Sequence, residues 1–138
     1  MKTAFIIIDV QNILVETGFE TQKLLEKISY LQDQARKQQI EIIYIQHIET
    51  EEALTSEDWK LSPLLKRQSD EKVFQKRYNS MFKETGLKEY LDQQGIEKLV
   101  LCGMQTEYCV DTSVKVAFEH GYKLVVPEGT VTTFDGDD

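Results

Sequence analysis

The segment TAFIIIDV, residues Thr3 to Val10, is the clearest indication of fold in this chain. It is a continuous apolar run that is closed by one acidic residue, Asp9. A run of this kind suits a β-strand that is buried on both faces, as the strands of a parallel sheet are. The segment therefore predicts a parallel sheet with Asp9 at the end of its first strand.

The rest of the chain alternates between helix-like and strand-like segments. Apolar residues recur at helical spacing from Leu24 to Ala35, which predicts an amphipathic helix. The β-branched run from Ile40 to Gln46 predicts a second strand, and the polar stretch from Thr50 to Lys72 predicts a long excursion with one helical turn. Further along, the patterns predict a short strand at Val73 and Phe74, a helix at Leu87 to Leu91, a strand at Ile96 to Cys102, a helix at Val110 to Phe118 and a strand at Tyr122 to Val126.

This alternation predicts βαβ units with right-handed crossovers. A length of 138 residues fits one domain. We therefore expect a single α/β domain over residues 1–138, with a Rossmann-like open parallel sheet of about five strands and helices on both faces, in three α/β/α layers.

The composition excludes several classes of partner. The formal net charge is −8, and an acidic protein is repelled by nucleic-acid backbones and by anionic membranes. No apolar run approaches the roughly 18 residues that a membrane span needs, and the run from Ala4 to Ile8 is too short for the core of a signal peptide. We therefore expect a cytoplasmic protein without nucleic-acid or membrane partners.

Two candidate reactive groups lie where an open parallel sheet gathers its ligands, beyond the carboxyl ends of the strands. Asp9 follows the first strand, and Cys109 follows the fourth, in GMQTEYCV (Gly103 to Val110). If Thr106 caps the next helix, Cys109 falls in its first turn, where the N–H groups and the helix dipole favour a thiolate and can stabilise an oxyanion. From position alone, Asp9 can equally be a capping residue and Cys109 a small buried hydrophobe.

Several other side chains leave their roles open. Cys102 lies inside an apolar strand, which predicts a core residue, and a disulfide with Cys109 is not expected in the cytoplasm. Lys76 cannot be told from a surface lysine by its local sequence. The candidate substrate-binding residues either line a pocket or serve only hydrogen bonding and packing; they are Gln11, His47, Trp59, Tyr78 and Phe82.

Three blocks of the sequence resemble the isochorismatase-like cysteine hydrolases. They are FIIIDVQN (Phe5 to Asn12), KRYNSMF (Lys76 to Phe82) and GMQTEYCV, the last followed by an alanine-bearing helix and HGY. Two weaker family features lie between them, IYIQH (Ile43 to His47) and WKLSPLL (Trp59 to Leu65). The resemblance therefore covers nearly the whole chain.

The resemblance implies a catalytic triad of Asp9, Lys76 and Cys109. It also implies a cis peptide between Met104 and Gln105, which aims the N–H of Gln105, with that of Cys109, at the substrate oxygen. In this mechanism Asp9 accepts the thiol proton, Lys76 stabilises the anionic pair, and Cys109 attacks a carbonyl carbon. Asp9 then activates the water that hydrolyses the acyl-enzyme.

By the same resemblance, the cysteine indicates the amidohydrolase branch, which cleaves C–N bonds of small molecules. Nicotinamidases in that branch bind a metal through an aspartate and two histidines between the first and middle blocks. Only His47 is a histidine there, so we expect no metal and no cofactor. The alternatives are a non-catalytic protein that binds a ligand or senses redox state through its thiol and, less favoured, a nicotinamidase or a vinyl-ether hydrolase of the isochorismatase type.

The resemblance also implies a homo-oligomer, a dimer or a tetramer, which would cover an edge strand of the sheet. Family members usually continue past the equivalent of Thr133 with another strand and helix, whereas this sequence ends at Asp138. The sheet therefore either stops at five strands or belongs to a shortened chain.

Overall fold

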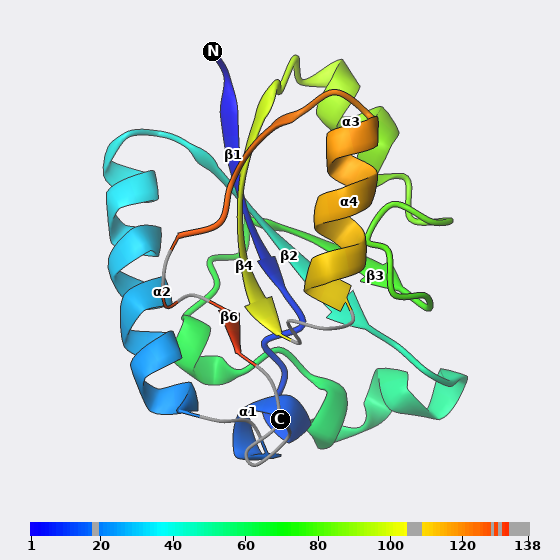
Figure 1. Ribbon diagram of the computed structural model, residues 1–138. Helices are drawn as coiled ribbons and strands as arrows, with labels where there is room; N and C mark the ends of the chain where they lie inside the picture. Colours follow the sequence, from blue (N-terminus) through cyan, green and yellow to red (C-terminus); the bar gives the residue numbers. More distant parts are fainter. Residues whose placement is uncertain (18–19, 105–108, 128, 130, 133–138) are drawn as a thin grey trace.

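The computed structural model describes residues 1–17, 20–104, 109–127, 129 and 131–132. In these ranges, one parallel sheet of six strands runs through the centre of the molecule (Figure 1). The strand order is β3-β2-β1-β4-β5, and β6 pairs with β4. The strands are β1 (Thr3–Ile8), β2 (Glu41–His47), β3 (Lys72–Lys76), β4 (Lys98–Met104), β5 (Lys123–Val125) and β6 (Val131–Thr132).

Helices cover both faces of the sheet, which gives three layers. The long helix α2 (Thr21–Lys37) lies on one face, and α3 (Leu87–Gln93) and α4 (Asp111–Glu119) lie on the other (Figure 1). The side chains of β1 alternate between two cores, because Phe5 and Ile7 pack in the cluster that contains α2, whereas Ile6 and Ile8 pack in the cluster that contains α3 and α4. The central strand is thus buried on both faces, as its apolar run predicts.

The predicted fold class is confirmed, and each of the five predicted strands lies within two residues of its expected bounds. The first strand is shorter than predicted, because Asp9 adopts a positive φ of 55° and ends it after Ile8. The sequence patterns missed the shortest elements, which carry too few residues to show a period. These are α1 (Asn12–Thr17), strand β6 and two of the three 3₁₀ turns η1 (Glu51–Thr55), η2 (Glu57–Trp59) and η3 (Pro63–Leu65).

The two cysteines lie on opposite faces of the sheet. Cys102 belongs to the core beneath α2, and Cys109 belongs to the core beneath α3 and α4. Both thiols are free, as expected. Only Cys109 is therefore placed to take part in a site on the α4 side.

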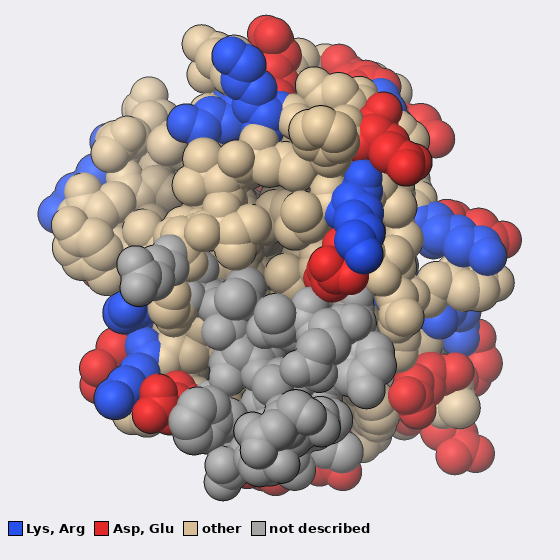
Figure 2. Space-filling view, in the orientation of Figure 1, with Lys and Arg blue, Asp and Glu red and all other residues tan. Residues whose placement is uncertain are grey.

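The surface mixes charges of both signs. Basic and acidic side chains are interspersed around the face in Figure 2, in keeping with a net charge of −8. No helix within the described ranges is long and apolar enough to cross a membrane.

Candidate active site

Four neighbouring strands each bring one chemical group to the same edge of the sheet. Asp9 directly follows β1, His47 ends β2, Lys76 ends β3, and Cys109 comes after β4. His47 and Lys76 are direct partners in the register of β2 and β3. The structure thus brings these four residues together beyond the carboxyl ends of the strands, the edge where open parallel sheets gather their ligands.

The backbone around Asp9 is shaped by one close approach. Gly103 pairs with Ile8 across β4 and β1, and a Cβ atom on Gly103 would lie 2.0 Å from the carbonyl oxygen of Ile8. Only glycine lets the two strands lie this close. The N–H of Asp9 donates to the carbonyl of Ile45 at 2.9 Å, which ties the backbone at the end of β1 to β2.

Lys76 lies at the centre of the site and is almost completely buried, with 1% of its surface exposed. Its Nζ lies 3.1 Å from Oδ2 of Asp9 and donates to Sγ of Cys109 at 2.9 Å. It also lies 3.0 Å from Nδ1 of His47 and donates to the carbonyl of Tyr78 at 2.9 Å. One ammonium therefore joins the predicted base to the predicted nucleophile.

Cys109 sits slightly ahead of the position that the sequence predicts. Helix α4 begins at Asp111. Cys109 and Val110 have π-helical conformation and lead directly into it. The thiol therefore lies before the first α-helical turn, and the predicted cap Thr106 lies outside the described residues. Ser113 of α4 is fully buried and accepts a hydrogen bond from the N–H of Met81 at 3.0 Å, which ties α4 to the loop after β3.

Electrostatics oppose a free thiolate in this site. Burial raises the pKa of Cys109 to about 12, together with the nearby charge of Asp9, although Lys76 works in the opposite direction. Burial also raises the pKa of Asp9, against the lowering effects of Lys76 and of a hydrogen bond with Cys109. Asp9 and Cys109 thus each affect the pKa of the other, which is the condition for coupled titration.

Asp9 keeps one oxygen available. Its Oδ1 is buried and has no hydrogen-bond partner among the described residues. A buried carboxylate oxygen without a donor is costly, and it is the atom best placed to take up a proton. This oxygen suits the role of a base.

The arrangement does not fit a metal centre. Oxygen, nitrogen and sulfur atoms of Asp9, His47 and Cys109 lie within 4.8 Å of one another, a spacing that could hold an ion. However, Nζ of Lys76 lies within 3.1 Å of one such atom of each residue. The ammonium is already the cation that these three groups surround, and a second cation beside it would be repelled.

The candidate substrate-binding residues occupy different environments. Gln11 is fully buried, and its amide is engaged with backbone: Oε1 accepts from the N–H of His47 at 2.8 Å, and Nε2 donates to the carbonyls of His47 and Trp59. The rings of His47 and Trp59 lie 6.0 Å apart. Phe82 stacks on Tyr122 at 6.2 Å and packs against the core. Gln11 and Phe82 are thus held in contacts within the protein.

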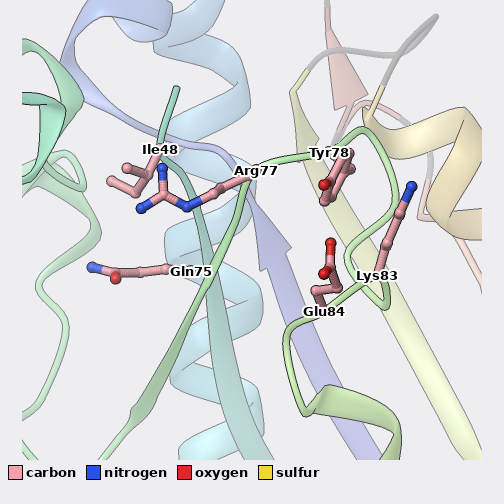
Figure 3. Close-up of a pocket in the computed structure, with 6 residues that line it drawn as sticks. All are labelled: Ile48, Gln75, Arg77, Tyr78, Lys83 and Glu84. Carbon is pink, nitrogen blue, oxygen red and sulfur yellow. The ribbon is translucent and has the colours of Figure 1, made fainter. Parts of the chain in front are cut away.

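Tyr78 lines a hollow of about 380 Å³ beside the buried site. Figure 3 shows Ile48, Gln75 and Arg77 on one side of it and Tyr78, Lys83 and Glu84 on the other. Lys83 lies over the Tyr78 ring at 4.0 Å. The hollow and the triad meet at Tyr78, whose side chain lines the hollow while its carbonyl contacts Lys76.

The expected oxyanion hole and one unpredicted residue, Asn79, complete the account of the site residues. Gln105 and its peptide with Met104 lie outside the described residues, so the expected oxyanion hole stays a prediction. Asn79 was not predicted, although it lies in the quoted KRYNSMF block, three residues after Lys76. Its Oδ1 lies 3.9 Å from Sγ of Cys109, and its place in that block was the only signal that could have pointed to it.

Comparison with known proteins places the chain among hydrolases. The family model of the isochorismatase domain matches residues 3–138. The streptothricin hydrolase of Streptomyces noursei is 28% identical over 96% of this chain and 50% of its own length. The maleamate amidohydrolase of Pseudomonas putida is 37% identical over 43% of this chain and 28% of its own length. This chain thus spans half or less of the length of these two relatives.

A solved structure agrees with the sequence comparison. The crystal structure of an isochorismatase family protein superposes with a TM-score of 0.88 at 30% identity, over 95% of this chain and 81% of that one. The match of the family model to nearly the whole chain, together with this shared fold, establishes the relationship. The chain belongs to the isochorismatase family, a family of hydrolases.

Proposed function

We propose that this protein is a cysteine hydrolase that cleaves the C–N bond of a small amide. Cys109 is the nucleophile, Asp9 the base and Lys76 the charge partner. The observation that carries the proposal is the position of Nζ of Lys76, which lies 3.1 Å from the Asp9 carboxylate and 2.9 Å from the Cys109 sulfur. A nucleophile, a base and a cation in contact are the parts that acyl transfer through a thiol requires.

The reaction begins with one proton transfer inside the site. The proton of the Cys109 thiol moves to Asp9, and the negative charge moves to sulfur beside the Lys76 ammonium. Sulfur then attacks the carbonyl carbon, and the proton on Asp9 passes to the departing nitrogen. Water loses a proton to Asp9 and attacks the thioester, which releases the acid and restores the Cys109 thiol.

An amide substrate agrees with these proton transfers. An amide nitrogen leaves poorly unless it is protonated, and Asp9 holds a proton at that step because its pKa is raised by burial. The name of one relative, maleamate amidohydrolase, describes the same class of reaction. Hydrolysis of a vinyl ether would not require a thiol nucleophile in this role.

The competing functions receive less support. A thiol redox sensor needs an accessible thiol of low pKa, whereas Cys109 is 8% exposed and burial raises its pKa to about 12. A metal-dependent nicotinamidase would need a cation among groups that already surround Lys76. Catalysis by the triad itself is therefore the favoured function.

The test is a panel of small aliphatic and aromatic amides, with released ammonia as the readout. We expect the wild-type protein to hydrolyse at least one of them and Cys109→Ala to hydrolyse none. Cys102→Ala is the matched control, since Cys102 is equally a buried thiol but lies on the opposite face of the sheet. Equal rates for Cys109→Ala and wild type would refute the nucleophile.

We also propose that the protein works in the cytoplasm as a homo-oligomer. Within the described ranges strand β3 is an edge of the sheet, and Phe118, Val125 and Val126 are exposed apolar side chains on and near α4 and β5. Apolar surface and open strand edges are commonly covered by assembly. Light scattering tests the oligomeric state, because a single species near the chain mass of 16.0 kDa would contradict a homo-oligomer.

A further inference from the structure

The ammonium of Lys76 has more acceptors than protons. A lysine ammonium carries three N–H bonds. Four acceptor atoms lie between 2.9 and 3.1 Å from Nζ, and they belong to Asp9, Cys109, His47 and the carbonyl of Tyr78. Three direct bonds cannot serve four acceptors at full strength at once, so the protons must be divided among them.

We propose that His47 is a positioning residue for Lys76. Nδ1 of His47 and the carbonyl of Tyr78 hold two ammonium protons throughout the reaction, and the third alternates between Asp9 and Cys109. This inference rests on the proposed function, because it describes how the same triad moves its charge.

The division follows from the charges of the four acceptors. The imidazole of His47 and the peptide carbonyl of Tyr78 keep their charge during the reaction, whereas Asp9 and Cys109 exchange one negative charge. When the thiol proton passes to Asp9, the carboxyl becomes a weaker acceptor and the sulfur a stronger one. The ammonium then needs only to redirect one N–H bond, while the other two keep Nζ in place. Lys76 stays protonated, so atoms and charge balance.

His47 is suited to the role of a neutral acceptor. A nitrogen that faces an ammonium at 3.0 Å must carry a lone pair, which puts the imidazole proton on Nε2. Burial lowers the pKa of His47 to about 4, and the charge of Lys76 acts in the same direction. The imidazole is therefore uncharged at neutral pH.

The backbone of His47 is itself clamped. Gln11 accepts from its N–H at 2.8 Å and donates to its carbonyl at 3.0 Å. The same amide also donates to the carbonyl of Trp59, whose ring lies 6.0 Å from the imidazole. With both backbone groups fixed, the ring can hold Nδ1 against Lys76 with little loss of entropy.

Two substitutions separate the acceptor from the ring. His47→Asn keeps an acceptor, because the side-chain oxygen of asparagine lies near the position of Nδ1. His47→Phe keeps a ring against Trp59 but has no acceptor. We expect kcat to fall by roughly 100-fold in His47→Phe and by roughly tenfold or less in His47→Asn, with little change in KM. His120→Phe is the control, since the only other histidine lies exposed at the end of α4.

A second readout needs no amide substrate. The rate at which iodoacetamide labels Cys109 at pH 7 reports how well Lys76 supports the thiolate, and it should fall in His47→Phe and recover in His47→Asn. If His47→Phe labels and turns over like wild type, or if His47→Asn is as slow as His47→Phe, the inference is wrong. Failure of the proposed function looks different, because Cys109→Ala would then keep the hydrolysis rate.

The wild-type protein offers a test that does not depend on the folding of a variant. Nitrogen-15 NMR distinguishes the two neutral tautomers of histidine, and we expect His47 to carry its proton on Nε2 with Nδ1 as an acceptor. A proton on Nδ1 would overturn the proposal, since that nitrogen could not then accept from Lys76.

Discussion

Two polar clusters of this protein, one buried and one half-buried, differ in how completely their hydrogen bonds are satisfied. One, which we call the catalytic cluster, consists of the proposed catalytic residues Asp9, Lys76 and Cys109 together with His47. The other, which we call the anchor cluster, consists of Gln32, Arg36, Tyr44 and Glu71 and joins α2 and β2 to the segment before β3. Both contain one cation and one carboxylate, so they differ mainly in how far these charges are buried and hydrogen-bonded.

The anchor cluster has a partner for each group. Arg36 donates to both oxygens of Glu71, at 3.0 and 2.9 Å. The hydroxyl of Tyr44 donates to Glu71 at 2.8 Å and accepts from Gln32 at 2.8 Å. Burial alone would raise the pKa of Glu71, but hydrogen bonds from Arg36, the N–H of Gln68 and Tyr44 together lower it. The ionised carboxylate is thus stabilised by the fold.

In the catalytic cluster the carboxylate is not stabilised to the same extent. Burial raises the pKa of Asp9 by more than Lys76 and Cys109 lower it. Among the described residues, Oδ1 of Asp9 has no hydrogen-bond partner. Asp9 also has a positive φ of 55°. Strained backbone and unsatisfied groups persist at functional sites because the chemistry needs them. An ion pair with all its hydrogen bonds made, such as Arg36 and Glu71, therefore does not mark a site, whereas a fully buried and incompletely satisfied pair such as Lys76 and Asp9 does.

The largest effect that we expect is the difference in turnover between variants of Lys76 and of Arg36, the cations of the two clusters. In Lys76→Met we expect turnover to fall by roughly 1000-fold or more, because the thiolate loses its counter-charge. In Arg36→Met we expect turnover within about twofold of wild type and a free energy of unfolding lower by about 1.5–3 kcal/mol, the range for hydrogen bonds to charged groups. Amide hydrolysis and urea unfolding measure the two outcomes. A comparable loss of turnover in Arg36→Met would erase the distinction.

Asp9→Asn should uncouple thiol reactivity from turnover. The charge of Asp9 raises the pKa of Cys109, after burial the largest cause, so its removal should lower that pKa and speed labelling by iodoacetamide at pH 7. Turnover should nevertheless fall by roughly 100-fold or more, because no base remains to activate water. Labelling is followed against pH by mass spectrometry, with fully buried Cys102 as the internal control. An unchanged or higher midpoint for Cys109 would contradict the coupling.

Two buried glutamines give a matched comparison between the clusters. Gln11 holds the backbone of His47, and Gln32 donates to the carbonyl of Leu65 at 2.7 Å in the anchor cluster. Replacing either by leucine leaves buried groups without partners, and we expect each protein to lose about 1–3 kcal/mol of unfolding free energy. Only Gln11→Leu should also lower kcat, by about tenfold, through misplacement of His47. Equal kcat values in the two variants would show that Gln11 has no catalytic consequence.

The sequence predicted the sheet better than the site. Uninterrupted apolar runs such as Phe5 to Ile8 identify buried strands, because few other environments tolerate them. Asp9 and Cys109 could be proposed from their places after strands. Lys76 could not, because its burial results from contacts with residues far away in the chain, and only the family resemblance pointed to it. The clamp that Gln11 forms is likewise a property of the folded chain, since its partners lie 36 and 48 residues away.

The weakest of the predicted effects is a pH dependence in the anchor cluster. The pKa of Glu71 is lowered in the folded protein, so its contribution to stability is complete above the unfolded pKa of about 4.3 and disappears as the pH falls through the lower folded pKa. Glu71→Gln should therefore unfold more easily than wild type at pH 7, by about 1–2 kcal/mol, and the difference should narrow below pH of about 4.3. Asp9 acts with the opposite sign, because its raised pKa means that acidification relieves the cost of its buried charge. That contribution is common to wild type and Glu71→Gln and cancels in their difference. Urea unfolding of both proteins at a series of pH values measures the difference in their free energies of unfolding. A difference that stays constant or widens toward low pH would show that Glu71 is not held as an anion by Arg36 and Tyr44.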